Sequence, residues 1–148
     1  MSDPLAAERL VPPTPGQLRR LMGEERLRPR KSLSQNFLTD PAALDAIVAA
    51  AELAPGDRVV EVGPGLGVLT RRLLAAGASV LAVEVDPRLA EYLRRELHGL
   101  ERFELIEADA LLHAREVYRI TGGNVIAECP FRLLPVDKLD LVDDDPRL

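Results

Sequence analysis

Short apolar runs alternate along this chain with longer segments in which apolar residues recur at helical spacing. The runs lie at residues 58–62 (RVVEV), 79–85 (SVLAVEV), 103–108 (FELIEA) and 124–128 (NVIAE). Runs of this length that are rich in valine and isoleucine are typical of buried strands. Alternation of such strands with helices predicts an α/β fold, in which helices pack on the faces of a parallel sheet.

Two of the predicted helices begin with the same signal. Asp40-Pro41 and Asp86-Pro87 each place an acid at the N-cap and a proline at the first helical position. A third helix is predicted from about Val68 to Ala76, and the segment 111–118 is only weakly helical. Apolar residues at helical spacing support the two Asp-Pro helices: Leu44, Ile47, Val48 and Ala51 in one, and Leu89, Tyr92, Leu93 and Leu97 in the other.

The two ends of the chain differ in charge. Residues 1–16 contain four prolines and little pattern, so we expect a flexible tail. Residues 17–31 are strongly basic, and Leu18, Leu21 and Met22 could form one face of a short helix there. The last residues are acidic and weakly patterned. We therefore expect an N-terminal tail and basic segment at 1–27, an α/β domain at 28–135 and an exposed acidic tail at 136–148.

Acidic residues lie at or just after the end of every predicted strand. Glu61 ends the first strand, Glu84 and Asp86 follow in the second, Asp109 comes after the third, and Glu128 ends the fourth. Because ligands of parallel sheets bind outside the carboxyl ends of the strands, these acids should converge on a ligand site. Asp109 could equally be the N-cap of a following helix.

The segment between the first strand and its helix is rich in glycine. Gly63, Gly65 and Gly67 allow a tight turn and a close approach of a ligand to the backbone. Glu84 follows at the distance that suits a ribose hydroxyl. A plain β–α turn is the structural alternative. The third glycine of the dinucleotide fingerprint would stand where Val68 is, and a group of acids suits a positively charged ligand, so S-adenosylmethionine is favoured over NAD.

Composition and net charge bear on the partners, the cellular compartment and the metal content of the protein. The formal net charge of −5 argues against a freestanding nucleic-acid-binding protein. The single cysteine, Cys129, fits a reducing compartment, and no secretory signal or membrane-spanning run is found, so we expect a cytoplasmic protein. His98 and His113 are isolated and lack metal-ligand spacing, so we expect no metal site.

Four ordered motifs resemble those of one family. "RPRKSLSQNFLTDP", "VVEVGPGLGVLT", "VEVDPRL" and "EADAL" are similar to the motifs of the rRNA adenine N6,N6-dimethyltransferases of the KsgA type and the related Erm methylases. The resemblance is dense from about Arg28 to Leu111. It implies a Rossmann-like, S-adenosylmethionine-dependent methyltransferase domain that acts on rRNA.

The resemblance also implies roles for individual residues. Asn36 and Leu38 would close over the methionine part of S-adenosylmethionine. Gly63 and Gly65 would let the cofactor approach the backbone. The hydroxyls of the ribose would bind Glu84, and the adenine amino group of the cofactor would bind Asp109. The target adenine would be flipped out of the RNA toward the methyl donor.

The family's catalytic motif is Asn-Leu-Pro-Tyr or close to it, at the end of the fourth strand. Here "ECPF" occupies that place, at residues 128–131. Pro130 would fix the backbone and Phe131 would stack on the flipped base. Glu128 stands where the family has the asparagine that accepts hydrogen bonds from the target amino group. A carboxylate also accepts hydrogen bonds, but it is longer by one methylene and charged.

The expected function is N6-dimethylation of adenine in small-subunit, 16S-type rRNA, with the small ribosomal subunit as partner and no membrane. The later strands of the family's sheet and its helical domain are expected to be absent from this chain. Alternatives are a non-catalytic fragment or pseudoenzyme that at most binds S-adenosylmethionine, and an Erm-like methylase of large-subunit rRNA. A small-molecule methyltransferase is disfavoured by the Gln-Asn-Phe-Leu segment.

Overall fold

The computed structural model describes residues 5–24, 27–33, 37–110 and 125–127. In chain order the elements are α1 (Ala6–Arg9), α2 (Pro15–Glu24), the 3-10 helix η1 (Lys31–Leu33), α3 (Pro41–Ala50), β1 (Arg58–Val62), α4 (Val68–Ala75), β2 (Ser79–Glu84), α5 (Pro87–Glu96), β3 (Phe103–Glu107) and β4 (Val125–Ala127).

The strands form one parallel sheet in the order β3-β2-β1-β4. The register pairs Val62 of β1 with Val83 of β2 on one side and with Ala127 of β4 on the other. Strand order therefore reverses at β1, which has a later strand on each side, and such a reversal is where α/β sheets place their ligands. The predicted α/β class with a parallel, Rossmann-like sheet is confirmed, and the strands lie where the sequence predicts them.

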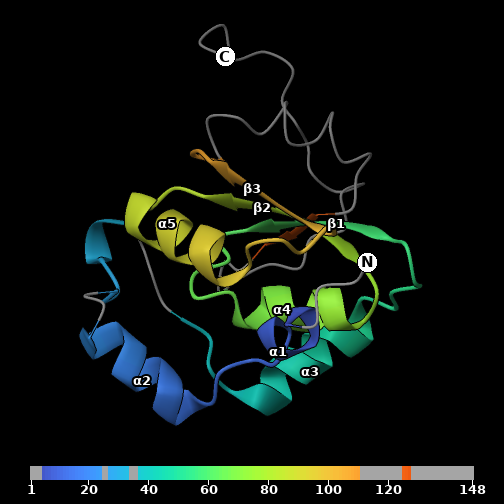
Figure 1. Cartoon of the computed structure of the whole chain (residues 1–148), viewed down its shortest axis with the longest axis horizontal. Coiled ribbons are helices and arrows are strands. Elements are labelled where there is room, and N and C mark those ends of the chain that lie inside the picture. Colours follow the sequence, from blue (N-terminus) through green and yellow to red (C-terminus); the bar gives the residue numbers. More distant parts are fainter. Residues whose placement is uncertain (1–4, 25–26, 34–36, 111–124, 128–148) are drawn as a thin grey trace, which may run out of the picture.

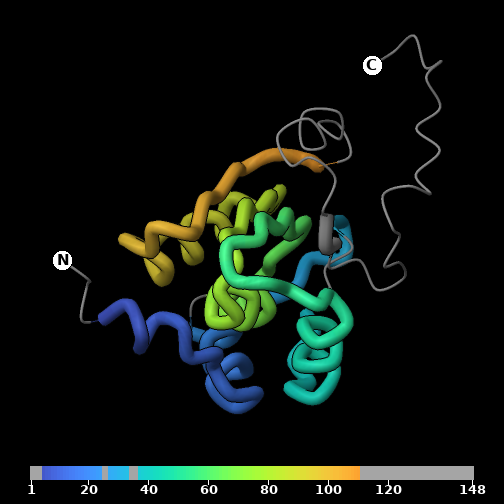
Figure 2. Tube along the Cα trace, turned by 90° about the vertical axis from the view of Figure 1, so that its right-hand side faces the viewer, coloured from blue at the N-terminus to red at the C-terminus, as the bar shows by residue number. Residues whose placement is uncertain are grey.

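The described helices lie on one side of the sheet (Figure 1), and the view at right angles shows the same layering (Figure 2). Alternate residues of β1, β2 and β3 face this layer: Val59 of β1, Val80 of β2 and Phe103 of β3 belong to the main core with α3, α4 and α5. The residues between them, such as Val60 and Leu81, form a second apolar cluster on the other face.

The two Asp-Pro helix starts are confirmed. Asp40 accepts a hydrogen bond from the Ala42 N–H at 3.1 Å and caps α3. Asp86 accepts one from the Arg88 N–H at 3.0 Å and caps α5. The weak helix predicted at 111–118 lies outside the described residues.

The N-terminal region departs from the flexible tail that the sequence predicts for residues 1–16. Residues 6–9 form α1, and α2 begins at Pro15. Thr14 and Gln17 form a capping box: the Gln17 N–H donates to Thr14 Oγ1 at 3.2 Å, and the Thr14 N–H donates to Gln17 Oε1 at 2.8 Å. Leu18 is fully buried in the main core.

Apolar contacts thus order this region although its prolines favour irregular backbone. Leu27 joins the same core cluster, so packing continues across the boundary expected at residue 28. The division into 1–27, 28–135 and 136–148 stays a prediction. Among the described helices, none is long and apolar enough to cross a membrane.

Candidate ligand site at the carboxyl edge of the sheet

The glycine-rich loop joins β1 to α4 at the carboxyl edge of the sheet. The Gly63 N–H donates to the Val83 carbonyl at 2.9 Å, so the loop starts in register with the end of β2. Gly63, Gly65 and Gly67 have φ angles of 72°, 58° and 73°, in the left-handed region that favours glycine. A Cβ added at Gly63 would meet nothing within 4 Å, so the backbone there borders open space that a ligand could enter.

Glu84 holds this loop from the neighbouring strand. Its Oε2 accepts a hydrogen bond from the Gly65 N–H at 3.2 Å, and its Oε1 accepts one from the Asp86 N–H at 2.9 Å. The residue is 3% exposed, and burial raises the pKa of its carboxyl. A carboxylate has about four acceptor sites, so the group can accept a further hydrogen bond from a ligand.

Glu61 lies behind the loop. Its Oε2 accepts a hydrogen bond from the Thr70 hydroxyl of α4 at 2.6 Å. Its Oε1 is buried and has no hydrogen-bond partner among the described residues. Burial, opposed by the Thr70 hydrogen bond and reinforced by repulsion from Glu84, raises the pKa of Glu61 to about 7. Neither carboxyl forms an ion pair with a cation among the described residues, and each holds its proton to a higher pH than an exposed carboxyl does.

Asp86 and Asp109, two further acids at strand ends, differ in burial and in hydrogen bonding. Asp86 is fully buried and already bonded, because it caps α5 and pairs with Arg88 at 2.5 Å. Asp109 follows β3 and is half-buried, and the adjacent Ala108 N–H donates to the Glu84 carbonyl at 3.0 Å. The structure thus brings Glu61, Glu84 and the end of β3 together, as the sequence predicts.

Several predicted site residues remain untested. Ala127, the residue before Glu128, pairs with Val62, which precedes the glycine loop. Glu128, Pro130, Phe131 and Asn36 themselves lie outside the described residues. Leu38 is half-buried and packs on the main core cluster, so its predicted contact with a ligand stays a prediction.

Arg71, which the sequence motifs do not mark, lies behind the loop. It is 4% exposed, and its Nη1 donates to the carbonyls of Leu66 and Gly67 at 3.0 and 3.1 Å. A charged residue in a helix is normally solvated, so the sequence carries no direct signal for this contact. The one indirect signal is Gly67, because a Cβ there would lie 3.0 Å from Arg71 Nη1 and 2.7 Å from Leu93 Cδ2.

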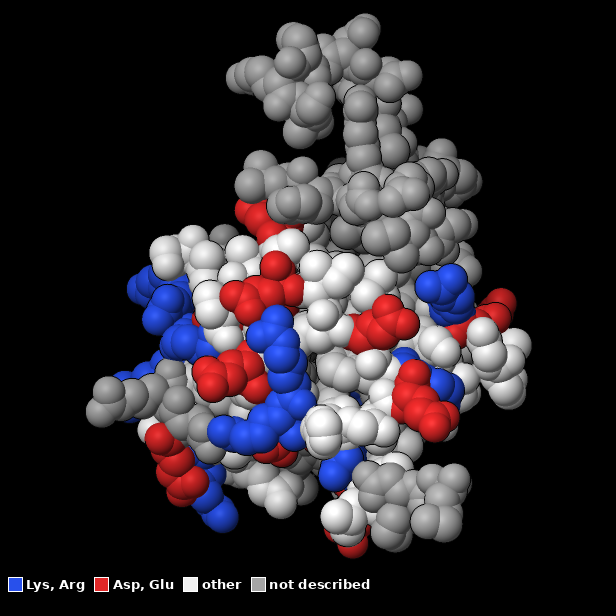
Figure 3. Space-filling model, turned by 45° about the horizontal axis from the view of Figure 1, so that its top comes forward, with Lys and Arg blue, Asp and Glu red and all other residues white. Residues whose placement is uncertain are grey.

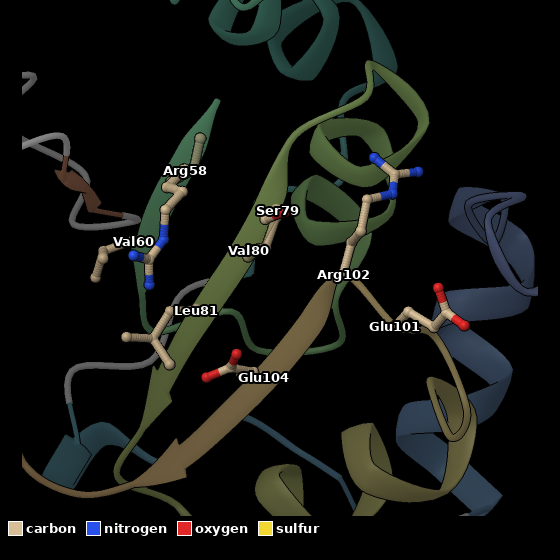
Figure 4. A pocket seen from close by; sticks show the side chains of 9 residues that line it. Arg58, Val60, Ser79, Val80, Leu81, Glu101, Arg102 and Glu104 are labelled. Carbon is tan, nitrogen blue, oxygen red and sulfur yellow. The ribbon is translucent and has the colours of Figure 1, made fainter. Parts of the chain in front are cut away.

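A separate hollow opens at the other edge of the sheet, around Arg58, Ser79 and Arg102 at the amino ends of the strands. Figure 4 shows Arg58 of β1 and Glu104 of β3 on the same side of the sheet, with Leu81 of β2 between them. This hollow lies away from the glycine loop and contains none of the predicted site residues. Among the described residues, no group of three or more His, Cys, Asp or Glu side chains could hold a metal ion.

Comparison with known proteins agrees with this geometry. The model of a family described as ribosomal RNA adenine dimethylase matches residues 26–120. The ribosomal RNA small subunit methyltransferase A of Pelotomaculum thermopropionicum is 48% identical over 102 residues, which are 69% of this chain and 35% of the relative. That of Deinococcus radiodurans is 46% identical over 132 residues, which are 88% of this chain and 44% of the relative.

Among solved structures, the 23S rRNA methyltransferase ErmE is 47% identical with a TM-score of 0.47, over 51% of this chain and 31% of that one. The chain spans less than half the length of either of the two curated relatives. The family model covers more than half of this chain and includes both the glycine loop and Glu84. The chain therefore belongs to the ribosomal RNA adenine dimethylase family.

Proposed function

We propose that this chain binds S-adenosylmethionine at the carboxyl edge of the sheet and transfers its methyl group to N6 of an adenine in rRNA. The observation that carries the proposal is the buried Glu84 carboxylate. It accepts a hydrogen bond from the Gly65 N–H and can accept another from a ligand. A ribose supplies two hydroxyl donors to such a group. Family membership supports the same ligand and the same reaction.

The charge at this edge suits S-adenosylmethionine better than NAD. Glu61 and Glu84 repel each other, and burial raises the pKa of both. A ligand that carries a sulfonium and an ammonium group relieves this repulsion, whereas a pyrophosphate increases it. Bound there, the cofactor supplies an activated methyl group, and the protein's task is to position the acceptor.

We assign the remaining contacts by the family motifs. Asn36 and Leu38 cover the methionine part, and Asp109 accepts from the adenine amino group of the cofactor. The position of Asp109 directly after β3, whose end bonds to the Glu84 carbonyl through Ala108, supports this assignment. In this arrangement Gly63 and Gly65 border the ligand with bare backbone.

The acceptor adenine is placed by the residues that follow β4. Ala127 lies in register with Val62, so the chain leaves β4 beside the glycine loop. In our proposal Phe131 stacks on the flipped base, Pro130 fixes the backbone, and Glu128 accepts a hydrogen bond from the target amino group. The family's asparagine would hold that nitrogen without a negative charge, so Glu128 is expected to slow transfer.

The finer assignment is dimethylation of small-subunit, 16S-type rRNA in the cytoplasm. It is supported by the family's description as a dimethylase and by the names of the curated relatives. Arg28, Arg30 and Lys31 are exposed in the basic segment and would contact RNA phosphates. On the face drawn in Figure 3, basic and acidic side chains are intermixed. Contacts with RNA phosphates would therefore involve small groups of basic side chains and not a broad basic surface.

The test is transfer of labelled methyl from S-adenosylmethionine to small ribosomal subunits that lack the adenine dimethylation. Label in adenine supports the proposal, and the ratio of monomethyl to dimethyl adenine fixes the number of transfers. Large subunits are assayed in parallel, because label there alone supports an Erm-like methylase instead. Glu128→Asn should raise transfer, and an unchanged or lower rate would remove the argument that this position limits it.

The replacement of the family's asparagine by Glu128 favours a second candidate, a binding protein without catalysis. It predicts that the folded chain binds S-adenosylmethionine and labels neither subunit.

A further inference from the structure

Arg71 is the fourth residue of α4, and its guanidinium reaches back to the start of this helix. A cation near a helix N-terminus is disfavoured by the helix dipole, so its charge does not stabilise α4. Burial of the guanidinium adds a further cost unless its donors are satisfied. The contacts that satisfy them come from three separate parts of the chain, the glycine loop, α1 and α5.

The first set of contacts reaches the loop. Arg71 Nη1 donates to the Leu66 and Gly67 carbonyls, at the point where the loop enters α4. On the opposite side the loop is held by the Val83 carbonyl and the Glu84 carboxylate, which accept from Gly63 and Gly65. The loop is thus held between the sheet edge on one side and the guanidinium on the other.

The second set of contacts reaches the N-terminal region. Arg71 Nε donates to the carbonyl of Arg9, the last residue of α1, at 3.0 Å. The side chain of Arg9 in turn donates to the His98 carbonyl beyond α5. The short helix α1 therefore lies beside α4 (Figure 1) and is linked by hydrogen bonds to α4 and to the segment that follows α5.

The third set of contacts reaches α5. Arg71 Nη2 lies 4.0 Å from Glu96 Oε2, and the buried Tyr92 hydroxyl lies against the same guanidinium. A single buried side chain thus bridges the loop, α1 and α5. The close fit of Gly67 against Arg71 and Leu93 leaves the loop little room to shift while these contacts persist.

We propose that Arg71 is a positioning residue that couples docking of the N-terminal helix to the geometry of the cofactor loop. The coupling is a consequence of shared contacts, because the same guanidinium bonds the Arg9 carbonyl and the loop carbonyls. If the guanidinium loses its contact with the Arg9 carbonyl or with the loop carbonyls, it no longer fixes the position of the other segment. The inference rests on the proposed binding of S-adenosylmethionine at this loop, and it goes beyond the family's motif residues.

The test compares Arg71→Met with Arg72→Met in the full chain. Arg72 is the next residue of the same helix and also forms an ion pair, at 2.9 Å to Asp45, but its partner lies on α3. The affinity for S-adenosylhomocysteine is measured by calorimetry after circular dichroism has shown that each variant is folded. We expect Arg71→Met to weaken binding about tenfold or more and Arg72→Met to change it less than about twofold.

A second readout separates coupling from general stability. Because linkage is reciprocal, S-adenosylhomocysteine should slow amide hydrogen exchange in residues 6–10 of the wild-type chain. This ligand-dependent protection should vanish in Arg71→Met and persist in Arg72→Met. Arg71→Lys, which keeps the charge but cannot reach all three carbonyls, should restore part of it. If Arg71→Met does not fold, the wild-type exchange measurement and Arg71→Lys still decide the question.

These experiments distinguish failure of the inference about Arg71 from failure of the proposed function. Wild-type affinity in folded Arg71→Met, or no ligand-dependent protection of residues 6–10 in the wild type, would overturn the inference and leave the proposed function standing. A folded wild-type chain that does not bind S-adenosylhomocysteine would overturn the proposed function and this inference with it.

Discussion

Glu84 and Glu61 are neighbouring buried carboxyls with different surroundings. Glu84 accepts hydrogen bonds from two backbone N–H groups, whereas Glu61 accepts one from Thr70 and leaves Oε1 without a described partner. Glu84 borders the loop that a ligand would approach, and Glu61 lies behind it. The first is therefore expected to act in ligand binding, and the second to make stability depend on pH.

For Glu84, the substitution Glu84→Gln should weaken binding of S-adenosylhomocysteine about tenfold or more. A hydrogen bond to a charged acceptor contributes about 1.5–3 kcal/mol, and the amide removes the charge and part of the acceptor capacity. Glu107→Gln is the matched control, because Glu107 pairs with Glu84 in the sheet register but bonds to Arg94. Equal affinity for Glu84→Gln and wild type by calorimetry would contradict the assignment.

For Glu61, the free energy of unfolding should depend on pH. Burial raises the pKa of Glu61 from 4.5 to about 7, so the folded protein keeps a proton that the unfolded chain has lost. This contribution to stability is fully present below about pH 4.5 and is lost as the pH rises through about 7. Glu61→Gln stays neutral and should lack it.

Urea unfolding of both proteins from about pH 5 to about pH 8 measures the effect. The wild-type stability should fall relative to Glu61→Gln with a slope of up to about 1.4 kcal/mol per pH unit. Parallel pH profiles for the two proteins would show that Glu61 ionises as it does in the unfolded chain.

The positions of individual residues could be predicted from the sequence where a residue type has few structural roles. The Asp-Pro helix starts, the glycine loop and the placing of Glu84 follow from local chemistry and the rules of parallel sheets. The buried position of Arg71 could not be predicted, because it depends on carbonyls contributed by α1 and by the loop. Such contacts exist only once tertiary packing is complete.

At the scale of elements, the junction between the loop and α4 depends on Gly67. A Cβ there would lie 2.7 Å from Leu93 Cδ2, and the residue also has a φ of 73°. Gly56 is the matched control, since its φ is 91° but a Cβ would meet nothing within 4 Å. Gly67→Ala should lower the free energy of unfolding by about 1–3 kcal/mol more than Gly56→Ala does, as measured by urea unfolding. Equal losses would show that backbone strain alone accounts for the effect.

The sequence predicts the N-terminal helices only in part: Leu18, Leu21 and Met22 indicate a short helix, as found in α2, but its start at Pro15 and the helix α1 are not predicted. The "TPGQ" of residues 14–17 is a capping-box sequence with proline at the first helical position, and it starts α2. The prolines on either side favoured interpretation as a flexible tail. The burial of Leu18 in the main core, which supplies the stabilising packing, is a long-range contact that a local pattern does not contain.

At the scale of the whole molecule, the parallel sheet determines where a ligand can bind. The order β3-β2-β1-β4 places the loop after β1 between the ends of β2 and β4. Glu84 reaches it from one side, and on the other the chain leaves β4 toward Glu128. The order of strands along the chain predicts an α/β sheet, and their order in space brings Glu84, the glycine loop and the end of β4 to one edge.

Binding of S-adenosylmethionine at this edge can be measured by titration of the full chain with S-adenosylhomocysteine and, for comparison, with NAD. We expect saturable binding of S-adenosylhomocysteine at one site per chain and no binding of NAD. A folded chain that binds neither compound, or that binds NAD as tightly as S-adenosylhomocysteine, would contradict this expectation.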